Sequence, residues 1–439
     1  MKILLIGNGA REHAIAEAFR KNPETSIFSY LKSRNPGIIP LSDGFEAGSY
    51  SDIDKIKSYA KKVNPDFAFI GPEEPLGCGV SDALASAGIS AVGPTKKLAQ
   101  LETSKSFTRN LLKKYRISGN PQFKIFNKKN IDDAKKFLGS IGECVIKPDG
   151  LTAGKGVKVQ GDHFSAKKEA LEYCNEVLQT HPAVIIEEKL EGEEFSLQCL
   201  TDGKTVIATP PVQDHKRAFA DDKGPNTGGM GSYSCEDHLL PFLKSGDITD
   251  GLEITKKVAD ALCKETGEYY KGVMYAGLIV TKNGVKLVEY NARFGDPEAM
   301  NVLPLMETDF SQVCKSIAEQ NLHKIKIKFQ RKATVCKYIV PNGYPSNPVS
   351  NEKIEIKKMP MDARLYYSSV DQRKDGLYLT SSRAVACVGI ADNLESAEKI
   401  AEKATKSVKG NLFHRKDIGT RKLIEKRIKH MKNILKDKD

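Results

Sequence analysis

The amino-acid sequence predicts a multidomain protein of mixed α/β and α+β class, with a doubly wound parallel sheet at its N-terminus. The chain has 439 residues, which is too long for one hydrophobic core and corresponds to about three domains of roughly 150 residues each. Strand and helix signals alternate along the N-terminal quarter, which is typical of a parallel sheet. Strand signals dominate the middle of the chain, so we expect a central α+β domain and, after it, a small C-terminal α+β domain.

The N-terminal domain is predicted to span residues 1–103. Ile3–Ile6 is an apolar run typical of a buried strand, and apolar residues recur at helical spacing in Glu12–Lys21. Phe67–Ile70 is a second buried-strand signal, and helical periodicity follows over Val80–Ala87. Ligands of such sheets bind at the carboxyl ends of the strands, where the glycine-containing turns after these two strands lie.

The central domain is predicted to span residues 104–325, with a glycine-rich lid subdomain at about 121–190. Strands are expected at Cys144–Lys147, Val157–Val159, Ala183–Glu188, Phe195–Leu200, Thr205–Thr209, Val273–Val280 and Val285–Tyr290. Helices are expected at Leu101–Tyr115, which joins the first two domains, and at Ser165–Leu178 and Ile248–Thr266. The mixture of both element types without strict alternation predicts an α+β arrangement.

The C-terminal domain is predicted to span residues 326–425. Strands are expected at Thr334–Ile339, Arg364–Ser368 and Ala384–Ile390, with a helix at Leu394–Val408. Residues 426–439 form a markedly basic terminal helix or tail, in which Ile428, Met431 and Leu435 lie near helical spacing.

The formal net charge of +12 raises the hypothesis of nucleic-acid binding, since clustered Lys and Arg neutralise phosphates. Much of the excess lies on predicted helical faces, as at Lys61 and Lys62, and the absence of Trp argues against a base-stacking platform. A solvated, lysine-rich surface is the favoured interpretation, so no nucleic-acid partner is expected.

The nine cysteines are scattered without a Cys-x-x-Cys pair, which indicates thiols in a reducing cytoplasm rather than a disulfide framework or a zinc site. No apolar run approaches the roughly 20 residues of a spanning helix, and the first residues enter a strand pattern without a signal-peptide cleavage site. We therefore expect a cytoplasmic protein with no membrane partner.

Gly7 and Gly9 follow the first predicted strand at the spacing that begins a dinucleotide-binding fingerprint. Glu12 occupies the third glycine position, and no acidic residue closes the strand near Phe28–Tyr30, so a nicotinamide site is not expected. The turn still directs backbone N–H groups from a helix N-terminus, which favours an anion such as a phosphate. A purely structural turn is the alternative.

Gly150–Gly156 is a glycine-rich connection between two predicted strands. It is not a Walker A loop, because Gly156 follows Lys155 and no glycine stands at the required distance before it. Such a loop can close over nucleotide phosphates, although an ordinary hairpin fits the pattern equally well. Lys147 adds a cation at the end of the preceding strand.

The two most informative segments are Asp214–Gly231 and Glu289–Glu298. The first places four polar or charged residues beside several glycines and a proline, which predicts a loop whose backbone comes close to a ligand. In the second, Glu289, Asn291 and Arg293 alternate, so on a strand all three project from one face. Oxygen ligands and an arginine on one face suit a hard metal ion that bridges phosphates.

The order of these features resembles that of the ATP-grasp enzymes, and among them the phosphoribosylamine–glycine ligase family. The resemblance covers nearly the whole chain, with matching blocks at Gly7–His13, Gly71–Glu73, Leu101–Lys105, Lys147–Leu151, Asp214–Arg217, Gly224–Gly231, Arg293–Glu298 and Phe413–Gly419. It implies a central ATP-grasp domain that uses ATP and Mg²⁺, or Mn²⁺. It further implies condensation of glycine with 5-phosphoribosylamine through glycyl phosphate, which gives glycinamide ribonucleotide, ADP and phosphate in purine synthesis.

The resemblance also implies roles for individual residues. The implied ATP-binding residues are Lys105, Lys147, Gly150, Gly154, Gly156, Glu187, Leu190 and Glu194, with Glu187 and Leu190 at the adenine edge and Glu194 at the ribose. The implied substrate-binding residues are Asn8, Gly9, Glu73, His215, Gly228, Gly229 and Asp296. Arg293, Lys216 and Asp214 would be catalytic, and Glu289 and Asn291 would hold the metal ion.

Two alternatives stay open at this point. Another ATP-grasp ligase that acts on a different carboxylate, such as a carboxylase or a formate-dependent transformylase, would share the ATP site but not the His215–Arg217 segment in this form. A non-catalytic nucleic-acid-binding protein is indicated by the net charge alone. The sequence does not give the oligomeric state, and we expect a monomer or a weak homodimer.

Overall fold

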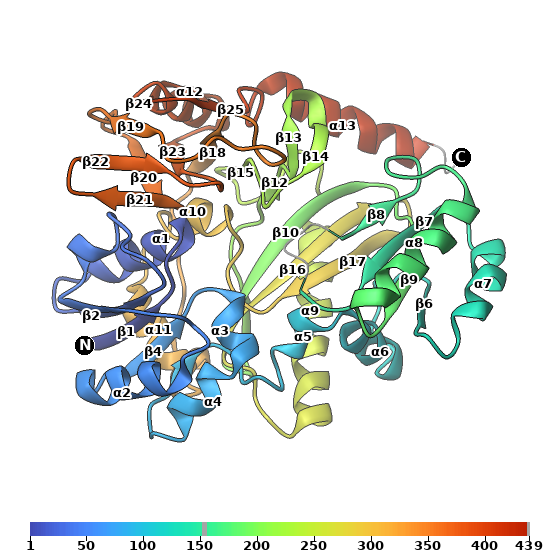
Figure 1. The fold of residues 1–439 in the computed structure, drawn as a ribbon, viewed down its shortest axis with the longest axis horizontal. Coiled ribbons are helices and arrows are strands. Elements are labelled where there is room, and N and C mark those ends of the chain that lie inside the picture. Colours follow the sequence, from blue (N-terminus) through green and yellow to red (C-terminus); the bar gives the residue numbers. More distant parts are fainter. Residues whose placement is uncertain (152–155, 437–439) are drawn as a thin grey trace.

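A parallel sheet forms the N-terminal part of the chain (blue in Figure 1) in the computed structural model, which describes residues 1–151 and 156–436. Its order is β3-β2-β1-β4-β5, with β1 (Lys2–Ile6), β2 (Ser26–Leu31), β3 (Gly44–Ala47), β4 (Phe67–Ile70) and β5 (Ala91–Val92). Its helices are α1 (Ala10–Arg20), α2 (Ile53–Val63), α3 (Glu73–Cys78) and α4 (Val80–Ala85). Right-handed crossovers from β1 to β2 and from β3 to β4 run in opposite directions, so α1 and α2 cover opposite faces. The predicted doubly wound sheet is confirmed.

The helix predicted over Leu101–Tyr115 is interrupted in the structure. α5 (Gln100–Thr103) ends and α6 (Lys105–Lys114) begins on either side of Ser104, whose backbone is extended. The Ser104 hydroxyl accepts a hydrogen bond from the backbone N–H three residues later at 3.1 Å. A new helix starts here because a serine satisfies a free N–H at a helix N-terminus. The break places Lys105 at the first position of α6.

The central sheet is antiparallel and has the order β11-β10-β16-β17. Its strands are β10 (Glu193–Thr201), β11 (Val206–Ala208), β16 (Gly272–Thr281) and β17 (Gly284–Asn291). α9 (Ser245–Thr266) contacts all four strands, and its Ile254, Val258 and Leu262 are buried at helical spacing. The sheet therefore shares one hydrophobic core with the N-terminal sheet.

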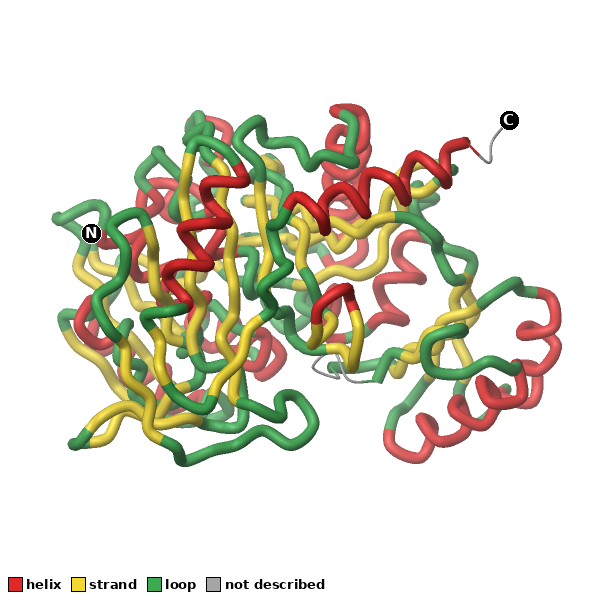
Figure 2. The backbone as a smooth tube through the Cα atoms, turned by 90° about the horizontal axis from the view of Figure 1, so that it is seen from above, coloured by secondary structure: helices red, strands yellow, loops and turns green. Residues whose placement is uncertain are grey.

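The lid subdomain projects from the central sheet at the right of Figure 1. Its antiparallel sheet has the order β6-β9-β7-β8, with β6 (Phe123–Phe126), β7 (Cys144–Pro148), β8 (Lys158–Val159) and β9 (Val184–Glu188). Its helices are η2 (Ile131–Asp133), α7 (Ala134–Ser140) and α8 (Lys167–Thr180). The buried residues of the lid form a hydrophobic cluster of their own, separate from the main core. Figure 2 shows from a second direction that the backbone of the lid projects away from the rest of the chain.

Two segments that are far apart in the sequence share the main sheet of the C-terminal part. Its order is β12-β15-β18-β23-β20, with β25 paired to β18. The strands are β12 (Gln213–Asp214), β15 (Gly231–Ser234), β18 (Ala333–Pro341), β20 (Ala363–Tyr367), β23 (Val385–Ala391) and β25 (Leu412–His414). α12 (Leu394–Thr405) packs on β18, β20 and β23. A second sheet contains β21 (Val370–Arg373), β22 (Gly376–Leu379), β19 (Lys353–Ile356) and β24 (Val408–Lys409). β12 and β15 come from within the predicted central domain.

The structure corrects the prediction of an irregular loop over Asp214–Gly231. β13 (Arg217–Phe219) and β14 (Lys223–Asn226) form a two-stranded antiparallel hairpin, closed by the 3₁₀ turn η3 (Ala220–Asp222). Pro225 is tolerated in β14 because, among the described residues, β13 and β14 pair only with each other, so a proline N at the outer edge of the hairpin costs no ladder hydrogen bond. The segment therefore projects as a hairpin from the C-terminal sheet.

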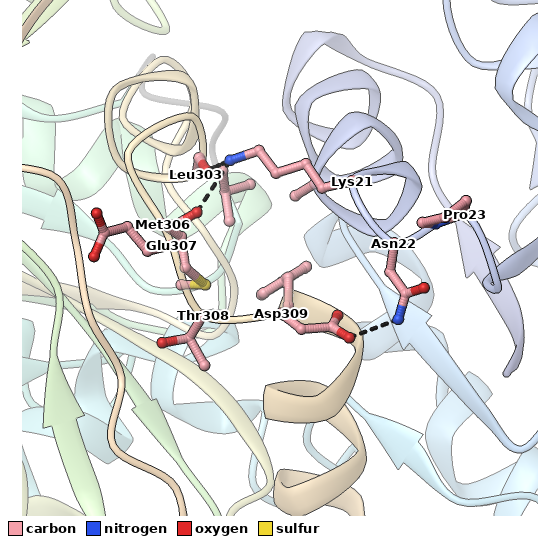
Figure 3. Close-up of a pocket in the computed structure, with 10 residues that line it drawn as sticks. Lys21, Asn22, Pro23, Leu303, Met306, Glu307, Thr308 and Asp309 are labelled. Carbon is pink, nitrogen blue, oxygen red and sulfur yellow. Dashed lines mark hydrogen bonds between the residues drawn. The ribbon is translucent and has the colours of Figure 1, made fainter.

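Short helices after the central sheet pack on α1 of the N-terminal domain. α10 (Ala299–Val302) and α11 (Phe310–Ala318) contact α1, and η4 (Leu322–Lys324) contacts α11. η1 (Ile39–Leu41) lies after β2. At this seam, shown in Figure 3, Lys21 Nζ donates to three carbonyls of residues 303–306 at 3.0–3.2 Å. Asn22 Nδ2 donates to Asp309 Oδ2 at 2.7 Å. The residues that line the pocket at this seam differ from the predicted site residues.

The predicted basic terminal helix is present. α13 (Arg421–Lys436) runs beside the β13–β14 hairpin (dark red in Figure 1), and its apolar Leu423, Met431 and Ile434 are buried. Residues 437–439 of the predicted tail lie outside the described residues. Within the described ranges, every helix is too short or too polar to span a bilayer.

Candidate active site

Arg293 lies at the centre of the predicted site. β17 ends at Asn291, and Arg293 follows in a loop, where its Nη2 lies 3.4 Å from Asn291 Oδ1. Two carboxylates hold the guanidinium: Glu73 Oε2 is 3.2 Å from Nε, and Glu102 Oε1 is 2.9 Å from Nη2. Burial opposes ionisation of Glu73, but Arg293 and Arg11 outweigh it and lower its pKa to about 2. The arginine is therefore fixed and charged.

Glu102 is a site residue that sequence reasoning missed. Its block, Leu101–Lys105, carries the resemblance, yet only Lys105 received a role. The Glu102 side chain is 5 % exposed, and its Oε2 accepts a hydrogen bond from the Ala292 N–H at 2.7 Å. One carboxylate thus fixes both the side chain of Arg293 and the backbone beside it. No local sequence signal indicates this contact, because the two partners lie far apart along the chain.

Lys216 connects the β13–β14 hairpin to the end of the central sheet. Its Nζ lies 3.2 Å from Glu194 Oε2 and 3.7 Å from Glu289 Oε1. The Glu194 carboxylate outweighs burial and raises the pKa of Lys216, so the ammonium stays charged. Burial opposes ionisation of Glu289, but Lys216, Lys147 and Lys105 together lower its pKa. Residues predicted as metal ligand, catalytic lysine and ribose contact therefore share one ion-pair network.

Lys147 and Glu187 form a buried ion-pair cluster on the lid side of the site. Glu187 Oε2 lies 2.8 Å from Lys147 Nζ, and Arg109 donates to both Glu187 oxygens at 2.6 and 2.8 Å. Burial opposes ionisation of Glu187, but Arg109 and Lys147 lower its pKa to about 2. Both oxygens are engaged, so Glu187 orients Lys147, and its contact with an adenine edge stays a prediction. Leu190 lies half-buried in the linker from β9 to β10.

Lys105 contacts the first glycine of the predicted glycine-rich loop. Lys105 Nζ donates to the carbonyl of Gly150 at 2.8 Å. Gly150 has a φ of +115°, which favours glycine. The carbonyl of Gly156 accepts a hydrogen bond from the Tyr173 hydroxyl at 2.8 Å. Gly154, also predicted to bind ATP, lies outside the described residues.

We call the part of the site around two carboxylates, the half-buried Asp214 and the buried Glu298, the acceptor side. The Tyr275 hydroxyl donates to Glu298 Oε1 at 2.8 Å, whereas Asp214 Oδ1 is buried without a hydrogen-bond partner among the described residues. Burial and then the Glu298 carboxylate raise the pKa of Asp214 well above its usual range, and burial raises that of Glu298. A buried acceptor without a partner is suited to a cationic donor from a ligand.

The turn at Gly228 and Gly229 packs against Asp214 and the loop that carries Asp296. A Cβ at Gly229 would lie 2.7 Å from Asp214 Oδ1, so a larger residue does not fit. Arg383, which precedes β23, donates to the Gly228 and Gly229 carbonyls at 2.7 and 2.9 Å and lies 3.3 Å from Asp296 Oδ1. Sequence reasoning missed Arg383, because a single distant arginine carries no local signal.

The N-terminal turn at Gly9 reaches the acceptor side. The Gly9 N–H donates to Glu12 Oε2 at 2.6 Å, and a Cβ at Gly7 would lie 2.1 Å from Glu12 Cγ. The Glu12 side chain therefore fills the space under the turn. Its carboxylate accepts a hydrogen bond from one of the backbone N–H groups that were expected to face an anion. A Cβ at Gly9 would lie 3.9 Å from Asp296 Oδ2. Asn8 Nδ2 donates to a serine hydroxyl in the loop after β2 at 2.9 Å.

The structure does not bring the His215 side chain together with the other predicted substrate residues. His215 alternates with Asp214 and Lys216, and its imidazole is fully buried, stacked on Tyr233 with ring centroids 6.0 Å apart. Its Nδ1 lies 3.7 Å from Asp222 Oδ1. Burial lowers the pKa of His215 to about 4, so the ring is neutral near pH 7. Its substrate role stays a prediction.

Glu289 and Asn291 supply one carboxylate and one amide oxygen at the end of β17. Among the described residues, no group of three or more His, Cys, Asp or Glu side chains could hold a metal ion alone. Mg²⁺ commonly binds through one or two carboxylates together with phosphates and waters. The two side chains therefore fit a divalent ion shared with a nucleotide.

The lid, the central antiparallel sheet and the lysine side chains where they meet, Lys105 and Lys147, define an ATP-grasp enzyme. Residues 103–299 match the ATP-grasp (A) domain of phosphoribosylglycinamide synthetase, residues 1–102 match its N domain, and residues 334–421 match its C domain. The chain belongs to the phosphoribosylglycinamide synthetase family. Enzymes of this class use ATP with a divalent metal ion. α13 lies beyond the matched residues, apart from its first residue.

Named relatives agree with this assignment. The chain is 49% identical to a phosphoribosylamine–glycine ligase of Methanocaldococcus jannaschii, with 99% of this chain and 100% of the relative aligned. It is 48% identical to the ligase of Methanosarcina acetivorans, with 99% and 98% aligned.

Solved structures agree as well. The crystal structure of the phosphoribosylamine–glycine ligase of Thermotoga maritima superposes with a TM-score of 0.80 at 25% identity, over 95% of this chain and 100% of that one. The biotin carboxylase domain of the 2-oxoglutarate carboxylase of Hydrogenobacter thermophilus, crystallised with MgADP, gives a TM-score of 0.72 at 16% identity. It covers 98% of this chain and 93% of that chain, and it shows the shared fold alone.

Proposed function

We propose that this chain ligates glycine to 5-phosphoribosylamine with ATP, through glycyl phosphate, and releases glycinamide ribonucleotide, ADP and phosphate in purine biosynthesis. One observation carries the proposal: four cationic side chains surround the Glu289 carboxylate at the end of the central sheet, and the incompletely bonded carboxylate pair Asp214 and Glu298 lies near one of them, Lys216. The four cations are Lys105, Lys147, Lys216 and Arg293. A nucleotide triphosphate needs the cations, and a substrate ammonium suits the carboxylates. The sequence relatives named as this ligase support the same substrates.

The lysines serve to place the triphosphate. Lys105 and Lys147 would contact its phosphates, while Glu187 and Arg109 hold Lys147 in one rotamer. The glycine-rich loop would cover the phosphates, because a reactive acyl phosphate must be shielded from water. Phosphoryl transfer depends mainly on such positioning and charge neutralisation.

The chemistry requires an activated carboxylate. A glycine carboxylate oxygen attacks the γ-phosphorus, the bond to the β–γ bridging oxygen breaks, and ADP leaves. The phosphoribosylamine nitrogen then attacks the acyl carbon, loses a proton and expels phosphate. Arg293, fixed by Glu73 and Glu102, would stabilise the negative charge that develops on the transferred group and on the tetrahedral oxygen.

The acceptor side would bind the amino groups. Asp214 Oδ1, buried without a partner among the described residues, would accept a hydrogen bond from the glycine ammonium. Lys216, paired with Glu194 and Glu289, would remain charged beside the phosphates. The turn at Gly9, which lies near Asp296, would hold the ribose phosphate end of the acceptor.

Glu289 and Asn291 would hold the divalent ion, and we propose Mg²⁺, which Mn²⁺ can replace. The ion would neutralise phosphate charge when bound. Oxygen donors of this kind fit both ions, so the preference rests on the demand of Mg²⁺ for few protein ligands.

We further propose a cytoplasmic monomer or weak homodimer with domains at residues 1–103, 104–325 and 326–425, and no nucleic-acid partner. The free thiols support the location, since they persist in a reducing compartment. The separate lid core supports a lid subdomain that moves as one unit within residues 121–190. A sedimentation measurement would test the assembly state.

A coupled assay of ADP release tests the reaction. ADP formation should require both glycine and phosphoribosylamine, generated in the assay, and mass spectrometry should detect glycinamide ribonucleotide. ADP release at an unchanged rate without glycine would refute the proposal. Replacement of glycine by bicarbonate or formate tests the other ATP-grasp ligases, and product formation with either would favour them instead.

A further inference from the structure

α13, which follows the matched C domain, forms partly buried ion pairs with both the β13–β14 hairpin and the start of β10. Arg427 projects from its middle with a side chain that is 17 % exposed. Arg427 Nη2 lies 2.5 Å from Asp222 Oδ2, and its Nε lies 3.5 Å from Glu193 Oε2. His430, one turn later, reaches Glu193 Oε1 with Nδ1 at 2.6 Å. One face of α13 therefore binds the hairpin and the start of β10 at once.

Each of the two bound carboxylates adjoins a residue of the Lys216–Glu194 ion pair. Glu193 is the chain neighbour of Glu194, and Asp222 closes the hairpin that begins after Lys216. Asp222 has a φ of +60°, a left-handed conformation that side chains rarely adopt, so its carboxylate contacts hold the turn in place. A shift of either carboxylate would therefore alter the geometry of the pair.

We propose that α13 positions the Lys216–Glu194 pair, and that Arg427 is the positioning residue that links its two halves. This inference rests on the proposed function, in which Lys216 lies beside the phosphates, and on the nucleotide-ribose contact that the family resemblance implies for Glu194. Arg427 touches neither substrate, and it acts through Asp222 and Glu193. The C-terminal helix thus stabilises the geometry of the nucleotide site and is not a free basic tail.

The contacts that Asp222, Glu193 and α13 would keep without Arg427 predict that its loss shifts the Lys216–Glu194 pair without unfolding the protein. Asp222 keeps Arg415 at 3.1 Å and Lys426 at 3.4 Å, and α13 keeps its buried apolar side chains. Glu193 keeps only His430 and a weak hydrogen bond from Gln213 Nε2 at 3.4 Å, because Arg427 was its other charged partner among the described residues. Displacement is therefore expected at Glu193 and Glu194 first.

The test compares Arg427→Met with the wild-type full-length chain. We expect the KM for ATP and the dissociation constant for ADP to rise about five- to tenfold, kcat to fall by a similar factor, and the KM for glycine to change less. Arg427→Lys should recover part of the nucleotide affinity, since it restores the charge. Lys432→Met, which removes an exposed cation from the same helix, is the matched control and should match the wild type.

A purely structural role would give a different result. In that case kcat would fall in proportion to the folded fraction, both KM values would stay at wild-type levels, and the inference would be overturned. Wild-type nucleotide affinity in a folded Arg427→Met variant would overturn it as well. If this variant does not fold, Glu193→Gln removes the same ion pair and should weaken ADP binding to a similar extent, whereas unchanged binding would refute the inference. ADP binding needs no turnover, so an inactive wild type would count against the proposed function alone.

Discussion

The lid side and the acceptor side of the active site differ in how their charges are balanced. On the lid side, two cations, Lys147 and Arg109, hold the single carboxylate of Glu187 through short contacts, which lower its pKa to about 2 and leave a net positive charge. On the acceptor side, the carboxylates of Asp214 and Glu298 interact, and the pKa values of both are raised. Both carboxylate oxygens of Glu187 on the lid side have partners without a ligand. On the acceptor side, Asp214 Oδ1 has no hydrogen-bond partner among the described residues, which favours a cationic ligand.

This contrast indicates which substrate each side selects. A preformed cationic surface binds phosphates without further rearrangement, which suits a nucleotide common to many ligases. A buried carboxylate pair binds only a ligand that brings a positive charge or hydrogen-bond donors. Selectivity for an amino acid over bicarbonate or formate is therefore expected to reside on the acceptor side.

The largest expected effect is at Arg293, which lies between the two sides. Arg293→Ala should lower kcat by roughly 10²–10³-fold, because it removes a fixed donor from the developing charge. The affinity for ATP should change far less. Steady-state kinetics with an ADP titration would measure both quantities. Equal losses in kcat and nucleotide affinity would reassign Arg293 to nucleotide binding, and Arg421→Ala, an 85 % exposed arginine, is the control.

Asp214→Asn should break the acceptor side while leaving the lid side intact. The KM for glycine should rise about 10- to 100-fold, since a hydrogen bond to a charged partner contributes about 1.5–3 kcal/mol. The KM for ATP should stay unchanged. The melting temperature should stay equal or rise, because the substitution removes a buried charge. A glycine KM at the wild-type level would show that Asp214 does not bind the ammonium.

The pH dependence of glycine binding sharpens the comparison. A carboxyl pair with raised pKa holds a proton at low pH, and this proton competes with the glycine ammonium. The KM for glycine should therefore fall as pH rises through the raised pKa, by up to about tenfold per pH unit for one proton. The KM for ATP should be nearly flat, because Glu187 is ionised throughout. Parallel pH profiles for both substrates would contradict this account.

The smallest expected effect is at a contact between the two sides. Arg217 of the hairpin pairs with Asp162 of the lid, whose side chains are 25 % and 48 % exposed. Exposed pairs contribute about 0.2–1 kcal/mol and weaken with salt. Asp162→Asn should therefore raise the KM for ATP by no more than about fivefold at low salt and less at high salt. A larger change that salt does not reduce would indicate that this contact fixes the lid.

Local sequence signals predicted most of the elements but not the connections between them. The apolar runs at Ile3–Ile6 and Phe67–Ile70 became β1 and β4, and the predicted helix Ile248–Thr266 became α9. The prediction of one continuous helix over Leu101–Tyr115 was wrong at Ser104, where the hydroxyl caps a new helix despite the helical periodicity of the sequence. The hairpin β13–β14 was missed, because its proline and glycine indicate a loop.

The sequence by itself determined the order of the elements, the separate lid and the residue types that surround Arg293. Those properties depend on periodicity, turn residues and short motifs, which act over a few positions. Only the tertiary structure decided that Glu102 and Glu73 hold Arg293, that Arg383 holds the glycine turn, and that α13 reaches Glu193. Such pairs join residues distant in sequence, and burial alone makes their electrostatic coupling strong.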